Sequence, residues 1–373
     1  MRLGLFMMPL HPPGPPMHVH IDEDTRKSLL AEELGFDELW LGEHFSAISE
    51  PYPSPLMFMA NLLPQTKRIK FATGVVNLPN RHPAVVAGEI AQFDHLSKGR
   101  LIFGAGTGSL GSDFELFQVG DAQTRQRMLV ESLDMIQKIW SSKPPYDIQG
   151  EFWTTRIQKS ISEELGLGEM PKPYQQPHPE ICVPSASPQS QTVRLAGQRG
   201  WSFVTSGLLQ QKFIGTHWEQ YVAGCAEAGR VADGGKWRLS RSVFVAPTDA
   251  EARRRIMDPR SAYQHFLGYM RTIFKNIGKL QSLKTHPDMA DGDITVNGII
   301  EDRVIFGSPQ TVAQKLIELR AQCGPFGTLL VIGADWTGVN EEWESESMRL
   351  LAREVIPMVT AAEKRASHAA AAE

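Results

Sequence analysis

A histidine at the end of a short apolar segment is the first residue of this chain that could do chemistry. His44 follows the segment DELWLG (37–42), with Glu43 between them. Histidine exchanges protons near neutral pH, which makes it the commonest general acid or base. The structural alternative is a ring that caps a loop or bonds a backbone carbonyl. Successive residues of extended chain point in opposite directions, so Glu43 and His44 need not touch.

Two further loops have the residue types that bind phosphate. The segment GAGTG (104–108) lets a ligand approach the backbone, whose N–H groups can hold an anion, and the alternative is a tight turn. The segment SASPQS (185–190) places small hydroxyl groups before a predicted helix, where free N–H groups and the helix dipole attract an anion. Simple N-capping by Ser187 is the alternative there, and both roles are compatible.

Three polar residues elsewhere suit a flat, phosphorylated ligand. Arg125 and Arg127 could each form paired hydrogen bonds to a phosphate, although a solvated helix face is the alternative. Asn77 has an amide that both donates and accepts, as the edge of a heterocycle requires. His82 begins a predicted helix and is expected to cap it rather than to act as a base.

Apolar side chains near the ends of the same segments predict a pocket with few polar groups. Such a pocket suits an apolar substrate, although some of these side chains are expected to be ordinary core. The residues are Phe6, Met8, Phe45, Met57, Phe58, Met59 and Trp201.

The elements that must position these residues form a repeating pattern. Apolar segments alternate with helix-like stretches, including an amphipathic helix over about 125–140, and the segments are continuous, as strands buried on both faces are. This pattern predicts a (β/α)8 barrel, in which chemistry collects at the C-terminal ends of the strands. The predicted strands are 2–9, 37–42, 69–76, 100–105, 180–184, 201–205, 239–246 and 328–333.

We expect one barrel domain over residues 1–360. Prolines and the sequence GEFW mark an insertion at about 142–179, and a helical, aromatic-rich insertion follows at about 249–303. The sequence FGSP (306–309) then opens a helix with proline in its first turn. The alanine-rich residues 361–373 are expected to be a flexible tail.

Composition excludes several classes of protein. A net charge of −4 argues against a nucleic-acid binder, and no apolar run is long enough to span a membrane. The apolar N-terminal stretch is interpreted as a strand rather than a signal peptide. The three cysteines are far apart, which suits a reducing cytoplasm and offers neither disulfides nor metal-ligand spacing, so no metal is expected.

Taken together, the motifs resemble the bacterial-luciferase-like flavin monooxygenases. The matching sequences occur in family order from about residue 2 to 360: LWLGEHF (39–45), RHP (81–83), DxxSxGRLIFGAGTG (94–108), SASP (185–188), TDAEA (248–252) and FGSPQTVAQKL (306–316). The sequence MPLHPP (8–13) is similar to members that oxidise cyclic terpenes or terpene ketones, such as limonene and diketocamphane monooxygenases. Gly106 stands where the light-emitting members have a cysteine, which argues against light emission.

The resemblance also implies roles at matching positions. His44 would be the active-site histidine near the flavin, and Arg125 would meet the flavin phosphate, with Arg127 as a close competitor. Phe6, Met8, Phe45, Met57 and Trp201 would line the substrate pocket. The remaining flavin contacts implied by the resemblance are Gly74, Val75, Asn77, Gly106, Thr107, Ser185, Ser187 and Ser190.

The resemblance further implies a reaction. Reduced FMN from a separate flavin reductase would react with O2 to a C4a-peroxyflavin, which transfers one oxygen atom to an apolar terpene or cyclic ketone by hydroxylation, epoxidation or Baeyer–Villiger insertion. His44 would hydrogen-bond the peroxide or move its proton. A homodimer is expected. Two alternatives remain open: an F420-dependent oxidoreductase that transfers hydride on the same barrel, and a non-catalytic flavin-binding protein.

Overall fold

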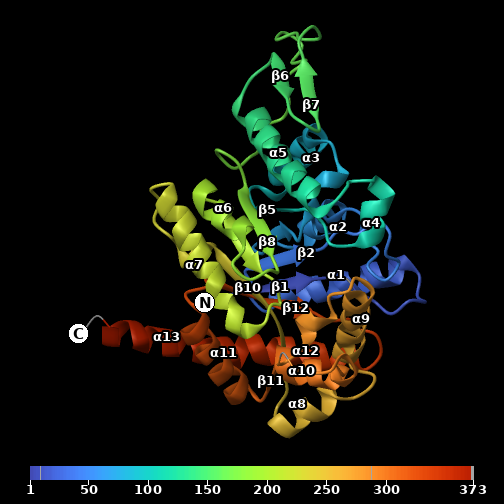
Figure 1. Ribbon diagram of the computed structural model, residues 1–373, viewed down its shortest axis with the longest axis vertical. Coiled ribbons are helices and arrows are strands. Elements are labelled where there is room, and N and C mark those ends of the chain that lie inside the picture. Colours follow the sequence, from blue (N-terminus) through green and yellow to red (C-terminus); the bar gives the residue numbers. More distant parts are fainter. Residues whose placement is uncertain (9, 287, 371–373) are drawn as a thin grey trace. The chain divides into compact units, whose positions relative to one another are not determined.

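The computed structural model describes residues 1–8, 10–286 and 288–370 as two compact units. The first unit comprises Met1–Leu39 and Ser185–Glu373, and the second comprises Trp40–Pro184. Figure 1 labels their elements along the chain. Each unit is described by itself. In the part of the chain that the structure describes, no helix is both long and apolar enough to cross a membrane.

The first unit is built on a parallel sheet in the order β11-β10-β12-β1, and β9 also pairs with β10. Nearly every residue of these strands is buried, because helices and further side chains cover both faces of the sheet. The strands are β1 (Arg2–Met7), β9 (Ser202–Thr205), β10 (Trp237–Val245), β11 (Val304–Gly307) and β12 (Thr328–Gly333).

Helices alternate with these strands in the first unit. Figure 1 shows α6 and α7 side by side, and glycines allow their close approach: a Cβ atom at Gly224 would lie 1.9 Å from the Arg194 carbonyl oxygen. The helices are α1 (Met17–Glu33), α6 (Gln191–Arg199), α7 (Gln211–Glu227), α8 (Asp249–Ile256), α9 (Ala262–Asn276), α10 (Val296–Arg303), α11 (Pro309–Cys323), α12 (Asn340–Leu350) and α13 (Ile356–Ala370).

The second unit has a parallel sheet centred on β5, which pairs with β3, β4 and β8. Gly104 on β5 is required by packing, because a Cβ atom there would lie 1.8 Å from the Thr73 carbonyl oxygen. The strands are β2 (Glu38–Leu41, ending in this unit), β3 (Lys70–Thr73), β4 (Val76–Asn77), β5 (Leu101–Gly106), β6 (Tyr146–Gln149), β7 (Thr154–Ile157) and β8 (Glu180–Ser185). The helices are α2 (Pro55–Leu62), α3 (Pro83–Ser97), α4 (Gly111–Phe117) and α5 (Ala122–Ser141).

The order of strands and helices is that of the (β/α)8 barrel, so the predicted fold class is confirmed. Each predicted strand corresponds to an observed one, but the prediction at 69–76 splits into β3 and β4. Strand β11 was not predicted, and Phe306 belongs to it, while the following helix begins at Pro309. Pro9, the last residue of the first predicted strand, lies outside the described residues.

The predicted insertions have definite secondary structure. Residues 142–179 contain the antiparallel hairpin β6–β7, and residues 249–303 contain α8, α9 and α10. Buried aromatic side chains such as Tyr263 and Phe266 pack α9 into an apolar cluster. The single domain over 1–360 stays a prediction. The predicted tail is helical as far as Ala370, and residues 371–373 lie outside the described residues.

Candidate active site

The His44 ring lies between two carboxylates in the second unit. Its Nδ1 is 3.4 Å from Asp113 Oδ2, and its Nε2 is 3.4 Å from Glu50 Oε2. The backbone N–H of His44 donates to the Tyr52 carbonyl at 3.1 Å, which fixes the chain at the end of β2. The imidazole is only 14% exposed. A ring held in this way can pass a proton to or from either nitrogen, which suits an acid–base role.

Asp113 fixes the segment that contains His44. It lies in the first turn of α4, is buried, and accepts hydrogen bonds from the backbone N–H groups of Phe45 at 3.2 Å and Ser46 at 2.9 Å. The Ser46 hydroxyl also donates to it. Asp113 and Glu50 join the candidate site through these contacts, and sequence reasoning missed both. Asp113 is 69 residues beyond His44, and no local pattern marks either carboxylate as a partner of the ring.

Glu43 faces a different set of partners from those of His44. Its carboxylate accepts the backbone N–H of Asn77 at 3.0 Å and the Arg81 guanidinium at 3.0 Å. Its carbonyl oxygen accepts the Asn77 side-chain N–H at 3.1 Å, which orients the amide. Burial raises the pKa of Glu43 to about 7, although Arg81 and the Asn77 N–H act in the opposite direction. The histidine segment is therefore tied directly to Asn77.

This arrangement predicts a pH-dependent stability. Because the pKa of Glu43 is raised from 4.5 to about 7, its contribution to stability is complete below pH 4.5 and is lost as the pH rises through about 7. We expect the unfolding free energy of the wild type, relative to Glu43→Gln, to fall by about 3 kcal/mol over that range. Chemical denaturation at several pH values measures this difference, and a pH-independent difference would contradict it.

A glycine-rich edge adjoins Asn77. The register of β4 and β5 pairs Asn77 with Gly106, and a Cβ atom at Gly106 would lie 2.5 Å from the Val75 side chain. Gly108 has a φ of +80°, which favours glycine, and an added Cβ would lie 3.4 Å from the Asn77 amide. The Thr107 hydroxyl bonds the carbonyl of Gly108. The structure therefore brings together the predicted residues of this edge, including Gly74, whose peptide bond to Val75 is cis.

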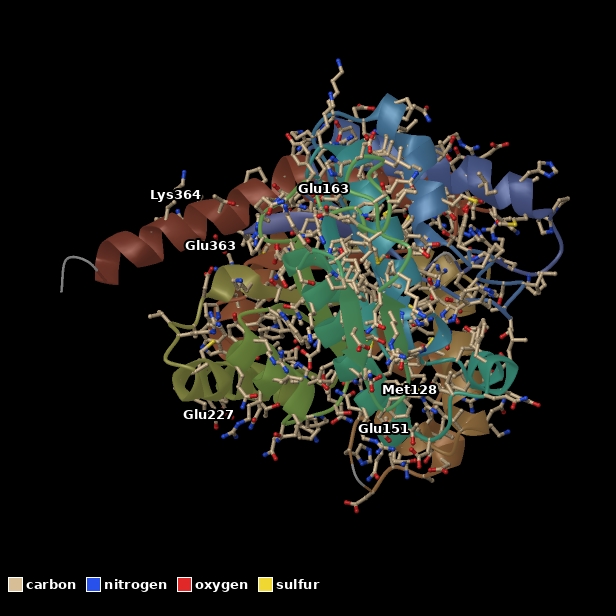
Figure 2. The ribbon with its side chains drawn as sticks, turned by 90° about the horizontal axis from the view of Figure 1, so that it is seen from above. Met128, Glu151, Glu163, Glu227, Glu363 and Lys364 are labelled. Carbon is tan, nitrogen blue, oxygen red and sulfur yellow. The ribbon has the colours of Figure 1, made fainter. Side chains whose placement is uncertain are left out.

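The two candidate arginines of α5 have different surroundings. Arg127 is exposed and pairs with Glu151 of the β6–β7 hairpin at 2.8 Å (Glu151 is labelled in Figure 2). The Arg125 guanidinium instead stacks 3.6 Å from the centre of the Phe114 ring and donates to the Gly120 carbonyl. Stacking holds its planar group without neutralising its charge, which suits an anion ligand.

In the first unit, the turn after β8 leads into α6. Ser190 is the N-cap of α6 and accepts the Val193 N–H at 3.3 Å, so the alternative of capping by Ser187 is wrong. The reason is spacing, because the hydroxyl must face an N–H group of the first helical turn. Ser185 is buried, and its carbonyl accepts the Ser206 N–H at 2.8 Å. Ser187 is exposed at the turn.

The residues predicted to line a pocket are scattered. Phe6 and Met8 are partly buried at and just after β1, and Phe45 packs edge-on against Phe117. The Met57 side chain is exposed on α2. Trp201 is buried and directly precedes the N-terminal end of β9. In a (β/α)8 barrel, residues at this end of a strand contribute to stability, whereas site residues lie at the C-terminal end. These positions do not support a pocket role for Met57 or Trp201. His82 caps α3 by accepting the Ala84 N–H, which confirms its structural role.

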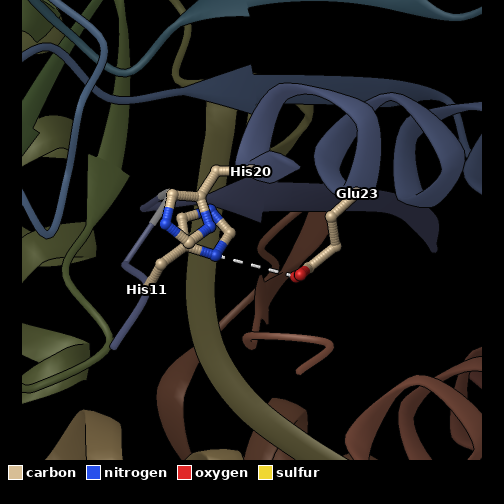
Figure 3. Close-up of side chains that lie close together, drawn as sticks. All are labelled: His11, His20 and Glu23. Carbon is tan, nitrogen blue, oxygen red and sulfur yellow. Dashed lines mark ion pairs between the residues drawn. The ribbon is translucent and has the colours of Figure 1, made fainter. Parts of the chain in front are cut away.

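A buried group that sequence spacing did not indicate contains His11, His20 and Glu23 (Figure 3). Their candidate ligand atoms lie within 4.8 Å of one another. However, the two imidazole rings are stacked 4.0 Å apart with planes only 19° from parallel, so their in-plane lone pairs run side by side and do not converge. Lys27 Nζ is 3.7 Å from Glu23 Oε1, which also disfavours a cation.

The His11 ring is instead a bridge between two carboxylates. Its Nδ1 is 2.9 Å from Asp335 Oδ1, and its Nε2 is 3.0 Å from Asp24 Oδ2. Burial would lower the pKa of His11, but these two hydrogen bonds outweigh it and raise the pKa to about 9. The resulting imidazolium joins the segment after β1 to α1 and to the segment after β12.

The chain is similar to several known proteins. The family model described as luciferase-like monooxygenase matches residues 1–324. The chain is 30% identical to 3,6-diketocamphane 1,6-monooxygenase of Pseudomonas putida, covering 96% of this chain and 98% of that protein. It is also 30% identical to limonene 1,2-monooxygenase of Rhodococcus erythropolis, covering 95% and 85%.

A solved structure has the same fold. It is the oxygenating constituent of 3,6-diketocamphane monooxygenase from Pseudomonas putida, a type II Baeyer–Villiger monooxygenase in complex with FMN. The TM-score is 0.86 and the sequence identity 28%, with 96% of this chain and 98% of that chain covered.

Proposed function

The chain belongs to the luciferase-like monooxygenase family and is a flavin-dependent monooxygenase, and we propose that its flavin is reduced FMN supplied by a separate reductase. Two relatives support this choice. The similar solved structure contains FMN, and a relative from Acinetobacter baylyi, 26% identical, is named the oxygenase component of a flavin-dependent trigonelline monooxygenase. Homodimer formation and a cytoplasmic location stay predictions.

The residues of each unit fit such a flavin. In the second unit, Asn77 and Gly106 are paired on neighbouring strands, and we propose that this edge borders the ring system. In the first unit, the exposed Ser187 and the N-terminus of α6 suit a phosphate. We assign flavin contacts to Gly74, Val75, Asn77, Gly106, Thr107, Arg125, Ser185, Ser187 and Ser190.

One observation carries the proposed chemistry: Glu43 ties the His44 segment to the Asn77–Gly106 edge. Bound reduced FMN supplies the electrons that activate O2. His44 holds or transfers a proton at one ring nitrogen, while Asp113 keeps the ring oriented. The apolar rings of Phe45 and Phe117 limit the access of water.

The proposed substrate is an apolar terpene or cyclic ketone that receives one oxygen atom. The support is the names of the relatives, which oxidise diketocamphane and limonene. Phe6, Met8 and Phe45 remain the candidate pocket residues. The FMN-bound, 28%-identical relative favours FMN over F420, and the named monooxygenase relatives favour an enzyme over a non-catalytic flavin-binding protein.

Product analysis tests this function. The full chain, a flavin reductase, NADH, FMN and ¹⁸O2 would be incubated with limonene, camphor and a diketocamphane. One ¹⁸O atom in the product supports the proposal. Hydride transfer from reduced F420 without ¹⁸O incorporation would contradict the proposal and would support the F420-dependent oxidoreductase instead.

A matched pair of variants tests the phosphate ligand. Arg125→Ala is expected to weaken the binding of reduced FMN by about tenfold, because a charge-assisted hydrogen bond to the phosphate is lost. Arg127→Ala should bind FMN as the wild type does, since Arg127 already pairs with Glu151. Anaerobic titration calorimetry measures both. Equal losses of FMN affinity in the two variants would contradict the assignment of Arg125 as the phosphate ligand.

A further inference from the structure

We propose that His217 on α7 is a positioning residue that holds the Ser187 turn in the conformation that binds the FMN phosphate. The inference rests on the proposed function, because it concerns the same flavin site. His217 is buried and is not among the residues to which we assign flavin contacts. His217 and the Ser187 turn both belong to the first unit.

His217 bonds the turn directly. It is 0% exposed, and its Nε2 donates to the Ser187 carbonyl oxygen at 2.8 Å. Ser187 has no helical partner for this carbonyl, because α6 begins only at Gln191. This bond fixes the backbone of the turn at Ser187, whose side chain is exposed. The imidazole therefore sets the orientation of the exposed part of the turn.

The other ring nitrogen is fixed by a chain of hydrogen bonds. His217 Nδ1 lies 2.8 Å from Thr205 Oγ1, and that oxygen accepts the Trp237 indole N–H at 2.8 Å. Because Nε2 donates to a carbonyl, Nδ1 accepts from the Thr205 hydroxyl in the neutral ring. Burial lowers the pKa of His217 and so preserves this neutral form. The ring cannot turn without leaving buried groups unpaired.

The neighbouring residue of α7 bonds the same turn. Thr216 Oγ1 accepts the backbone N–H of Gln189 at 3.1 Å and donates to the Phe213 carbonyl at 2.6 Å. Two successive side chains of α7 thus hold two backbone groups of the turn. Farther along the same two helices, α6 packs closely against α7, since a Cβ atom at Gly197 would lie 2.4 Å from the Tyr221 carbonyl oxygen.

A buried cation beside His217 is consistent with an anionic ligand. Arg241 is 4% exposed and donates to four backbone carbonyls, those of Ser206, Gly207, Leu209 and Ser240. Its charge opposes protonation of His217. The segment that Arg241 contacts begins at Ser206, and the backbone N–H of Ser206 donates to the Ser185 carbonyl. Arg241 therefore places a buried positive charge within electrostatic range of the His217 ring, and such a charge favours an anion nearby.

Two substitutions at one position test the role. In His217→Gln, the amide nitrogen can replace Nε2 as donor to the Ser187 carbonyl. In His217→Asn, the shorter amide reaches only the Thr205 side. Dissociation constants of the full chain for reduced FMN and reduced riboflavin would be measured anaerobically by titration calorimetry. Riboflavin lacks the phosphate. A variant that has lost only the phosphate-binding turn should therefore bind riboflavin normally, whereas general damage to the site should weaken the binding of both flavins. Inorganic phosphate serves as a competitor of FMN.

We expect His217→Asn to raise the dissociation constant for FMN about tenfold, as loss of one buried hydrogen bond would. Its affinity for riboflavin should stay within about twofold of the wild type, and phosphate should compete less well. His217→Gln should restore most of the FMN affinity. Thr216→Val, which removes the bond to Gln189, should cause a smaller loss and covers the case in which His217→Asn fails to fold.

The outcomes separate the two proposals. If the wild type binds FMN and neither His217→Asn nor Thr216→Val changes that affinity, the positioning role is wrong and the proposed function stands. Equal losses for FMN and riboflavin would reduce His217 to a structural residue. If the wild type binds neither flavin, the proposed function fails, and the positioning role fails with it.

Discussion

Replacing His44 by alanine is expected to lower oxygenation of substrate by about 100-fold, which is within the range for loss of a general acid or base. The reason is that the ring lies between Asp113 and Glu50 with one nitrogen toward each, so the variant loses the group to which we assign the proton transfer. Reduced FMN should still bind, because the side chains that we assign to it remain.

The experiment compares product formed with NADH consumed. In His44→Ala, NADH oxidation should continue while the fraction that yields oxygenated product falls. His95→Ala is the matched control, because His95 is an exposed histidine of the same unit that bonds the Lys172 carbonyl. The control should retain wild-type coupling. Wild-type oxygenation by His44→Ala would remove His44 from the mechanism.

Replacing Glu38 by alanine is expected to destabilise the fold by about 3–5 kcal/mol. Glu38 on β2 and Arg238 on β10 form a pair with two hydrogen bonds of 2.8 and 2.9 Å, and both side chains are 1% exposed. Removing the carboxylate takes from a buried guanidinium the opposite charge and the two hydrogen bonds that Glu38 supplies. Arg238→Met should lower the stability of the fold by a similar amount, because the buried Glu38 carboxylate then loses the positive charge of Arg238.

Denaturation in urea measures this effect, and a double variant separates charge from packing. Glu38→Leu combined with Arg238→Met removes both charges and should be more stable than either single variant, because no unpaired charge remains. Glu341→Ala is the control, since its pair with Arg26 is on the surface and its loss should leave the unfolding midpoint close to that of the wild type. A midpoint in Glu38→Ala equal to that control would contradict the prediction.

Apart from β11 and the break between β3 and β4, the strands could be predicted from the sequence, as could the positions where candidate site residues follow them. Continuous apolar segments can be buried on both faces only in a covered parallel sheet, so their order already predicts a (β/α)8 fold. His44 after β2 and the serine turn before α6 follow from the same local patterns. These features depend on interactions within a few residues along the chain, which the sequence displays directly.

Only the tertiary structure decided which side chains meet. The carboxylates beside His44, the choice between Arg125 and Arg127, and the bond from His217 to the Ser187 turn all join different segments. The N-cap is Ser190 and not Ser187, because α6 begins at Gln191 and the Ser190 hydroxyl faces the Val193 N–H. A side chain's chemistry depends on its partners in space, and separation along the chain does not encode them.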